Sequence, residues 1–150
     1  MNNLIHVLTL RQVLNVWSDG AEKEANKFAD EHRDLLPRRV TNSQLYGLAN
    51  IVRSAYRFND IKNFIQHQGE KAERSNRPDV HGYWLALGRK LSELYDEAQK
   101  LLQQAGSVLD KKDKKEALDE LHRQMVETFV QHLIAHSLYW SPVAGGKSRS

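Results

Sequence analysis

The sequence predicts an all-α protein, because apolar residues recur three and four positions apart along most of its 150 residues. No stretch of useful length alternates apolar and polar residues as a half-buried β-strand does. The chain has only three prolines and eight glycines, and they fall mainly where a helical period ends. Short connections favour antiparallel neighbours. We therefore expect a compact bundle of five to six helices in a single domain, residues 1–142, followed by a disordered tail, residues 143–150.

Two helices are predicted in the first 36 residues. The sequence Ser18-Asp19-Gly20 is typical of a helix end, so the first helix should cover about residues 4–18. A more polar helix over about residues 21–36 should follow and end at Pro37, because the residue before a proline disfavours helical geometry. The first helix has one apolar face, which is formed by Leu10, Val13, Leu14 and Trp17.

A capping box predicts the start of the next helix. Thr41 supplies a hydroxyl at the N-cap position, and Gln44 follows three residues later. We expect this helix to run to about Phe58, and a short helix capped by Asn59 to cover about residues 60–74. The first of these two helices has a predicted buried face that consists of Leu45, Leu48, Ile51, Val52, Ala55 and Tyr56.

Two long helices complete the predicted bundle. One should cover about residues 80–105 and end at Gly106, because glycine is favoured just past a helix C-terminus. The charged run over residues 110–116 should be a loop or a frayed first turn. The last helix should cover about residues 114–140 and stop at Pro142.

The composition limits the kind of protein. The absence of cysteine excludes disulfides and thiolate metal sites, and no window approaches the roughly 18 apolar residues that a membrane span needs. We therefore expect a cytoplasmic protein without a membrane partner. No Gly-rich phosphate loop, nucleophile elbow or EF-hand loop occurs, so we expect no catalytic activity and no cofactor.

Positive charge is concentrated in one part of the chain. Residues 38–77 contain eight basic and three acidic residues, an excess of +5, whereas the whole chain carries +3. Such segregation is typical of proteins that bind polyanions, although basic residues also form ordinary solvated surfaces. We call residues 38–77 the basic segment; its cations are Arg38, Arg39, Arg53, Arg57, Lys62, Lys71, Arg74 and Arg77.

A second face of the helix that begins at Thr41 carries polar and aromatic residues. Tyr46, Asn50, Arg53 and Arg57 recur three and four apart, beside the apolar face. Cations spaced along a helix can contact successive phosphates without reading the bases. We therefore predict that phosphates are contacted by Arg38, Arg39, Arg53, Arg57, Lys62, Arg74 and Arg77, and sugar or base by Tyr46 and Asn50.

An enzymatic alternative rests on a second pattern. Arg74, His81 and Tyr83 resemble the R-x4-6-H motif of HEPN ribonucleases, in which the His and Arg act at the 2′-hydroxyl and the scissile phosphate of RNA. Pro78 lies inside the spacer. The competing interpretation is an ordinary helix start, in which Asp79 is the cap and Trp84 enters the core.

A further alternative is a helical adaptor. His132 and His136 lie four apart on one helix face, a spacing that zinc sites use. However, Leu133 replaces the glutamate of an H-E-x-x-H motif, and no third ligand is evident. We therefore predict no metal site and place the two histidines at a helix–helix contact or a subunit interface.

Three segments together resemble a known family. Thr41-Asn-Ser-Gln-Leu45 opens a helix, residues 61–68 (IKNFIQHQ) lie in a second helix, and residues 129–140 (FVQHLIAHSLYW) close the last one. With the intervening basic residues, this pattern is similar to the small subunit of type III CRISPR–Cas effector complexes, the Csm-type more than the Cmr-type. The likeness covers roughly residues 40–140.

The resemblance implies a specific role. Such small subunits are all-helical and have no catalytic activity. Neighbouring copies stack along the complex and face the CRISPR backbone and large subunits, and basic side chains help to seat the guide RNA and target RNA. In this chain, Arg53 and Arg57 would then face nucleic acid.

Overall fold

The computed structural model describes residues 2–36, 38–104 and 111–149, and within them the side chains of residues 11–36, 38–104 and 113–138. These residues form helices and connecting turns without a β-strand, which confirms the all-α prediction. The helices are α1 (Asn2–Glu31), α2 (Asn42–Ser54), α3 (Phe58–Arg74), α4 (Pro78–Gln104) and α5 (Lys111–Arg149).

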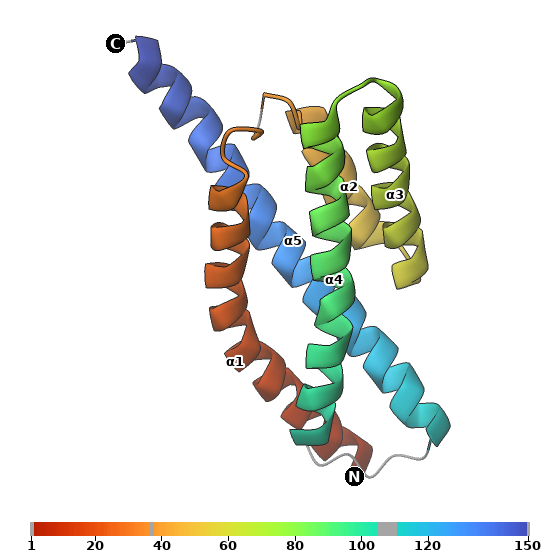
Figure 1. Cartoon of the computed structure of the whole chain (residues 1–150). Helices are drawn as coiled ribbons and strands as arrows, with labels where there is room; N and C mark the ends of the chain where they lie inside the picture. Colours follow the sequence, from red (N-terminus) through yellow and green to blue (C-terminus); the bar gives the residue numbers. More distant parts are fainter. Residues whose placement is uncertain (1, 37, 105–110, 150) are drawn as a thin grey trace.

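Helix α5 is the centre of the arrangement. It crosses the molecule diagonally and contacts each of the other four helices (Figure 1). Helix α1 packs mainly against α5, whereas α3 packs mainly against α4, so that α2 and α3 lie together at one side. All five helices contribute to one core, for example through Ala25, Leu45, Ile61, Trp84 and Phe129.

The capping box that was predicted from the sequence is present at the start of α2. The backbone N–H of Gln44 donates to the hydroxyl of Thr41 over 3.3 Å, and the N–H of Thr41 donates to the side-chain oxygen of Gln44 over 3.0 Å. The amide nitrogen of Gln44 also donates to the side-chain oxygen of Gln68 in α3 over 3.3 Å. This cap therefore fixes both the start of α2 and its position against α3.

The N-terminal part of the chain is one helix and not two. Helix α1 continues through Gly20, so the expected end at residues 18–20 is wrong. Glycine disfavours a helix interior by about 1 kcal/mol relative to alanine, which is a small penalty beside the burial of a long helix face. The buried alanines that follow continue the helical spacing and pack against the core: Ala21, Ala25 and Ala29.

The ends of two other helices also differ from expectation. Helix α2 ends at Ser54, one turn before the expected end near Phe58, and α3 begins at Phe58 with Arg57 at its N-cap in place of Asn59. Helix α5 runs to Arg149, so the expected stop at Pro142 is wrong and most of the expected tail is helical. Proline lacks one N–H, but the other helical hydrogen bonds of α5 do not depend on it.

Two further expectations concern the connection before α5. The expected helix end at Gly106 lies outside the described residues. The charged run is helical from Lys111 onward and forms the first turns of α5.

Candidate nucleic-acid interface

The basic segment folds into α2, α3 and the turns beside them. All eight of its cations are exposed to solvent. Among the residues that the structure describes, Arg39 is the only one of the eight with an ion-pair partner, which is Asp79 at the start of α4. Exposed cations without carboxylate partners can neutralise the phosphates of a ligand. The other seven cations of the basic segment are therefore available to contact phosphates.

Arg39 has a different environment from the other seven. Its Nε lies 2.6 Å from Oδ2 of Asp79, and its Nη2 donates to Oδ1 over 3.0 Å. Desolvation raises the pKa of Asp79, but hydrogen bonds from the N–H of Val80 and from Arg39 outweigh it, so the pKa is lower than its usual value. The guanidinium thus already has an anionic partner, and Arg39 is the predicted site residue least suited to bind a phosphate.

The turn between α2 and α3 brings two predicted arginines to one place. After Ser54 the chain becomes extended at Ala55, so Arg57 does not continue the stripe of Tyr46, Asn50 and Arg53 along α2. Arg53 and Arg57 nevertheless line the same open cavity of about 1000 Å³, which we call the junction cavity. It lies between this turn and the first half of α5.

Tyr56 is an exposed aromatic residue that sequence reasoning placed in the core. Its side chain is 88% exposed and lies between Arg53 and Arg57 in the lining of the junction cavity. The apolar period of α2 continues through Ala55 to Tyr56, but the helix ends at Ser54, two residues before Tyr56, so this period does not apply to Tyr56. The only local signals for the break were the polar residues Asn59 and Asp60, which suit a new helix start.

The opposite wall of the junction cavity is acidic. It carries Glu116, Asp119 and Glu120 from α5, together with one cation, Arg123. Nη2 of Arg123 lies 2.9 Å from Oε1 of Glu120, and this bond is the main reason that the pKa of Glu120 is lower than usual. The cavity therefore combines a basic wall from the α2–α3 turn with an acidic wall from α5.

His122 contributes a buried imidazole to the same cavity. Its side chain is 3% exposed, and Nε2 donates to the carbonyl oxygen of Leu91 over 2.9 Å. The ring of Phe58 lies over it with centroids 4.4 Å apart. Burial lowers the pKa of His122, although the Leu91 carbonyl and Asp119 favour the charged form. The neutral imidazole with its proton on Nε2 fits this geometry.

The remaining predicted site residues lie elsewhere on the basic segment. Tyr46 and Asn50 are exposed on α2. Lys62 lines a separate groove of about 600 Å³ between α3 and α4. Arg74 is the last of the 17 residues of α3, which places it about 25 Å from the junction cavity along the helix axis. The remaining two residues precede helices at the same end: Arg38 before α2 and Arg77 before α4.

The HEPN-like residues do not form one accessible site. The side chain of Tyr83 is 1% exposed, and its hydroxyl is buried without a hydrogen-bond partner among the described residues. Burial raises its pKa far above the usual value. Nε2 of His81 lies 3.8 Å from Oε2 of Glu73. Arg74 is exposed. Tyr83 therefore belongs to the core, where RNA cannot reach it.

His132 and His136 of α5 face the bundle. Nε2 of His136 lies 3.0 Å from Oδ1 of Asp30 in α1, which confirms a helix–helix contact for this residue. Nε2 of His132 is buried. In the part of the chain with described side chains, no three histidine or carboxylate groups are close enough to hold a metal ion. This contact within the chain makes the histidine face a poor surface for an adaptor partner.

Over the described residues, none of the helices combines the length and the apolar character that crossing a membrane requires. No protein-family model, no curated protein sequence and no solved structure shows a significant match to this chain.

Proposed function

We propose that this protein is a non-catalytic RNA-binding subunit that holds the RNA backbone on the surface of α2 and α3. The observation that carries the proposal is the concentration of exposed cations in the basic segment, seven of which have no ion-pair partner among the described residues. Each phosphate that such a cation neutralises releases counterions, which drives binding without sequence preference.

The dimensions of α3 suit a short stretch of RNA. Arg57 precedes its first turn and Arg74 is its last residue, so cations lie at both ends of a helix about 25 Å long. At about 3.4 Å per nucleotide along a stacked strand, this length corresponds to about seven nucleotides. A strand that contacts both ends would therefore run along α3.

Within this proposal, the chain acts as the small subunit of a type III CRISPR–Cas effector complex. The support is the resemblance of three segments, which lie at the start of α2, in α3 and in the second half of α5. Its partners would be the CRISPR backbone and large subunits, guide and target RNA, and neighbouring copies of itself. Because Arg53 and Arg57 are exposed, they are available to RNA that neighbouring subunits would hold.

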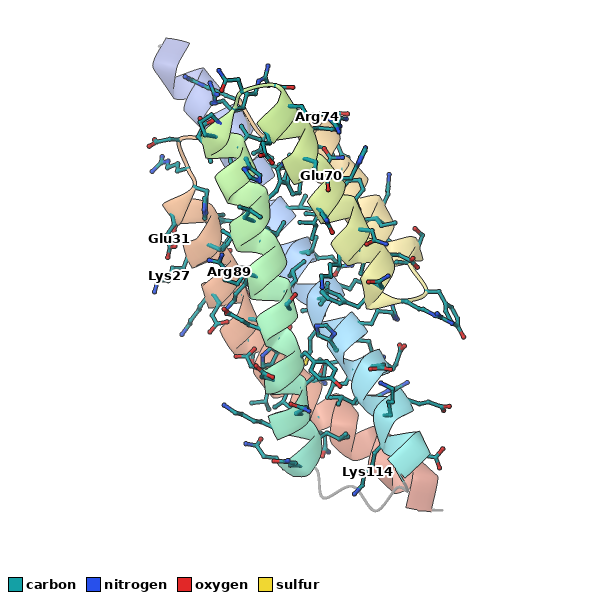
Figure 2. The ribbon with its side chains drawn as sticks, turned by 45° about the vertical axis from the view of Figure 1, so that its right-hand side comes forward. Lys27, Glu31, Glu70, Arg74, Arg89 and Lys114 are labelled. Carbon is teal, nitrogen blue, oxygen red and sulfur yellow. The ribbon has the colours of Figure 1, made fainter. Side chains whose placement is uncertain are left out.

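A matched pair of double variants tests the RNA contact. Arg53→Ala with Arg57→Ala should weaken binding of a labelled RNA for all sequences alike. The negative slope of log affinity against log salt should become shallower by about 0.7 per lost phosphate contact. Lys23→Ala with Lys27→Ala removes the same charge from α1, on the other side of α4 from α3, where Figure 2 shows Lys27 and Arg74 far apart. This control should leave the slope unchanged.

The assembly is tested by purifying the tagged chain from its own cells and identifying the bound proteins and RNA. Co-purification with CRISPR backbone subunits and repeat-derived guide RNA would support the assignment. A clean monomer or dimer without either would contradict it. Equal salt slopes for the two double variants would contradict the contact at Arg53 and Arg57.

A further inference from the structure

We propose that Tyr56 is a stacking platform for one unpaired base of single-stranded RNA, at the turn between α2 and α3. This inference deepens the proposed function and rests on it. Tyr56 is the most exposed of the large apolar residues with described side chains, at 88%, compared with 75% for Val16 and 54% for Tyr46. A ring held in water in this way is available to a ligand.

The backbone around Tyr56 explains why the ring points away from the bundle. Ala55 is extended, with φ −67° and ψ 133°, and its N–H donates to the carbonyl of Ile51 over 2.8 Å to close α2. Arg57 is also extended at the N-cap of α3, with φ −128° and ψ 148°. The two helix ends thus hold Tyr56 between them. No ring contact or hydrogen bond to Tyr56 exists among the described residues.

The flanking arginines supply the second half of a single-strand site. Proteins that bind single strands combine aromatic platforms, on which bases stack, with cations that follow the backbone. Arg53 and Arg57 line the same cavity as Tyr56 and have no carboxylate partner among the described residues. They can hold the phosphates on either side of a base that stacks on the ring.

The acidic wall favours a base over a further phosphate as the occupant of the junction cavity. The three carboxylates of Glu116, Asp119 and Glu120 outnumber the one cation of this wall, Arg123, so the wall would repel a phosphate placed deep in the cavity. Carboxylates accept hydrogen bonds, and the edge of an unpaired base presents N–H donors. The phosphates should therefore remain on the α2–α3 side, with the base turned toward α5.

A paired base inside a duplex cannot occupy this position, because both of its faces are already stacked. Tyr56 should thus distinguish single-stranded from double-stranded RNA, whereas the arginines should serve both. This difference separates the platform from the backbone contacts of the proposed function.

The test measures the affinity of the full chain for a labelled 12-nucleotide RNA, alone and annealed to its complement. Tyr56→Ala should weaken single-strand binding by about 5- to 150-fold, the range that loss of one stacked base produces, and should change duplex binding by less than about twofold. Tyr56→Phe keeps the ring and should bind the single strand like the parent chain. Circular dichroism of each variant checks that the helices are intact.

The outcomes separate the two proposals. If the parent chain binds the single strand and Tyr56→Ala binds it equally well, the platform is overturned while the backbone contacts stand. An equal loss for single strand and duplex would also overturn it, because that result assigns Tyr56 to general surface contact. If the parent chain binds neither RNA, the proposed function fails, and the platform fails with it.

Discussion

The guanidinium of Arg39 and the carboxylate of Asp79 form a two-point contact across 40 residues of sequence, with Nε 2.6 Å from Oδ2 and Nη2 3.0 Å from Oδ1. The contact joins the turn before α2 to the first turn of α4. Helix α4 begins at Pro78, so Asp79 is its second residue and not the expected N-cap. Its carboxylate accepts from the N–H of Val80 over 2.8 Å and also holds Arg39.

This contact predicts different phenotypes for two arginines of the same segment. Arg39→Ala should lower the melting temperature slightly, because Asp79 loses its partner, and should lower RNA affinity less than Arg57→Ala does. Arg57→Ala should leave the melting temperature nearly unchanged, because Arg57 is exposed and has no ion-pair partner among the described residues. Thermal melts and anisotropy titrations of the two variants make the comparison. A larger affinity loss for Arg39→Ala would contradict this assignment.

Gly20 provides a test of the continuous helix α1. A Cβ at this position would meet nothing within 4 Å, so Gly20→Ala should raise the free energy of unfolding by about 0.5–1 kcal/mol through helix propensity alone. Chemical denaturation measures the change. A helix break at residues 18–20 would produce the opposite sign.

Gly47 of α2 is the matched control for Gly20. A Cβ there would lie 3.3 Å from Cζ of Phe64, which is tighter than ordinary van der Waals contact. Gly47→Ala should therefore gain less stability than Gly20→Ala, or lose stability, although both positions are helical.

His122 should make stability depend on pH. Burial, opposed by the Leu91 carbonyl and Asp119, leaves its folded-state pKa below the unfolded value near 6.5. As the pH falls below 6.5, the unfolded chain binds a proton that the folded chain does not, so the free energy of unfolding decreases until the pH passes the folded-state pKa. Urea denaturation at pH 7 and pH 5 should show a smaller decrease in the free energy of unfolding for His122→Gln than for the parent chain. Equal losses would show that His122 does not titrate in this way.

Phe129 should be among the most sensitive core positions. Its ring is fully buried, and the centroids of the Phe129 and Phe28 rings lie 6.3 Å apart in an edge-to-face arrangement. Phe129→Ala should lower the free energy of unfolding by about 3–5 kcal/mol through lost burial and a cavity. Tyr56→Ala removes a ring of similar size from the surface and should change it by less than about 0.5 kcal/mol. Denaturant titrations of both variants test whether the two aromatic residues have these opposite roles.

The parts of the fold that depend on neighbours in sequence could be predicted. The capping box at Thr41 and Gln44 needs only four consecutive residues, and both of its hydrogen bonds are present. The sequence also predicts one apolar period along α4 from Trp84 to Ala105. Its members from Trp84 to Ala98 are buried, Leu101 is half-buried, and Ala105 lies outside the described residues.

The parts that depend on tertiary contacts could not be predicted. Gly20 looked like a helix stop, but α1 continues because its face packs against α5. The break after Ser54 has no proline or glycine to mark it, and the apolar period runs past it. Arg53 and Arg57 were predicted together for the wrong reason, since a turn and not one helix face joins them. For the same reason the exposure of Tyr56 was missed.

The pairing of α1 with α5 has a consequence for synthesis on the ribosome. Asp30 and His136, which join the two helices, are separated by 106 residues. At about 5–20 residues per second, α1 would wait on the order of 5–20 seconds for the segment that covers it. Until then its apolar face is open to chaperones, or to the same helix of a neighbouring nascent chain. A nascent chain therefore remains exposed at α1 until α5 has been synthesised.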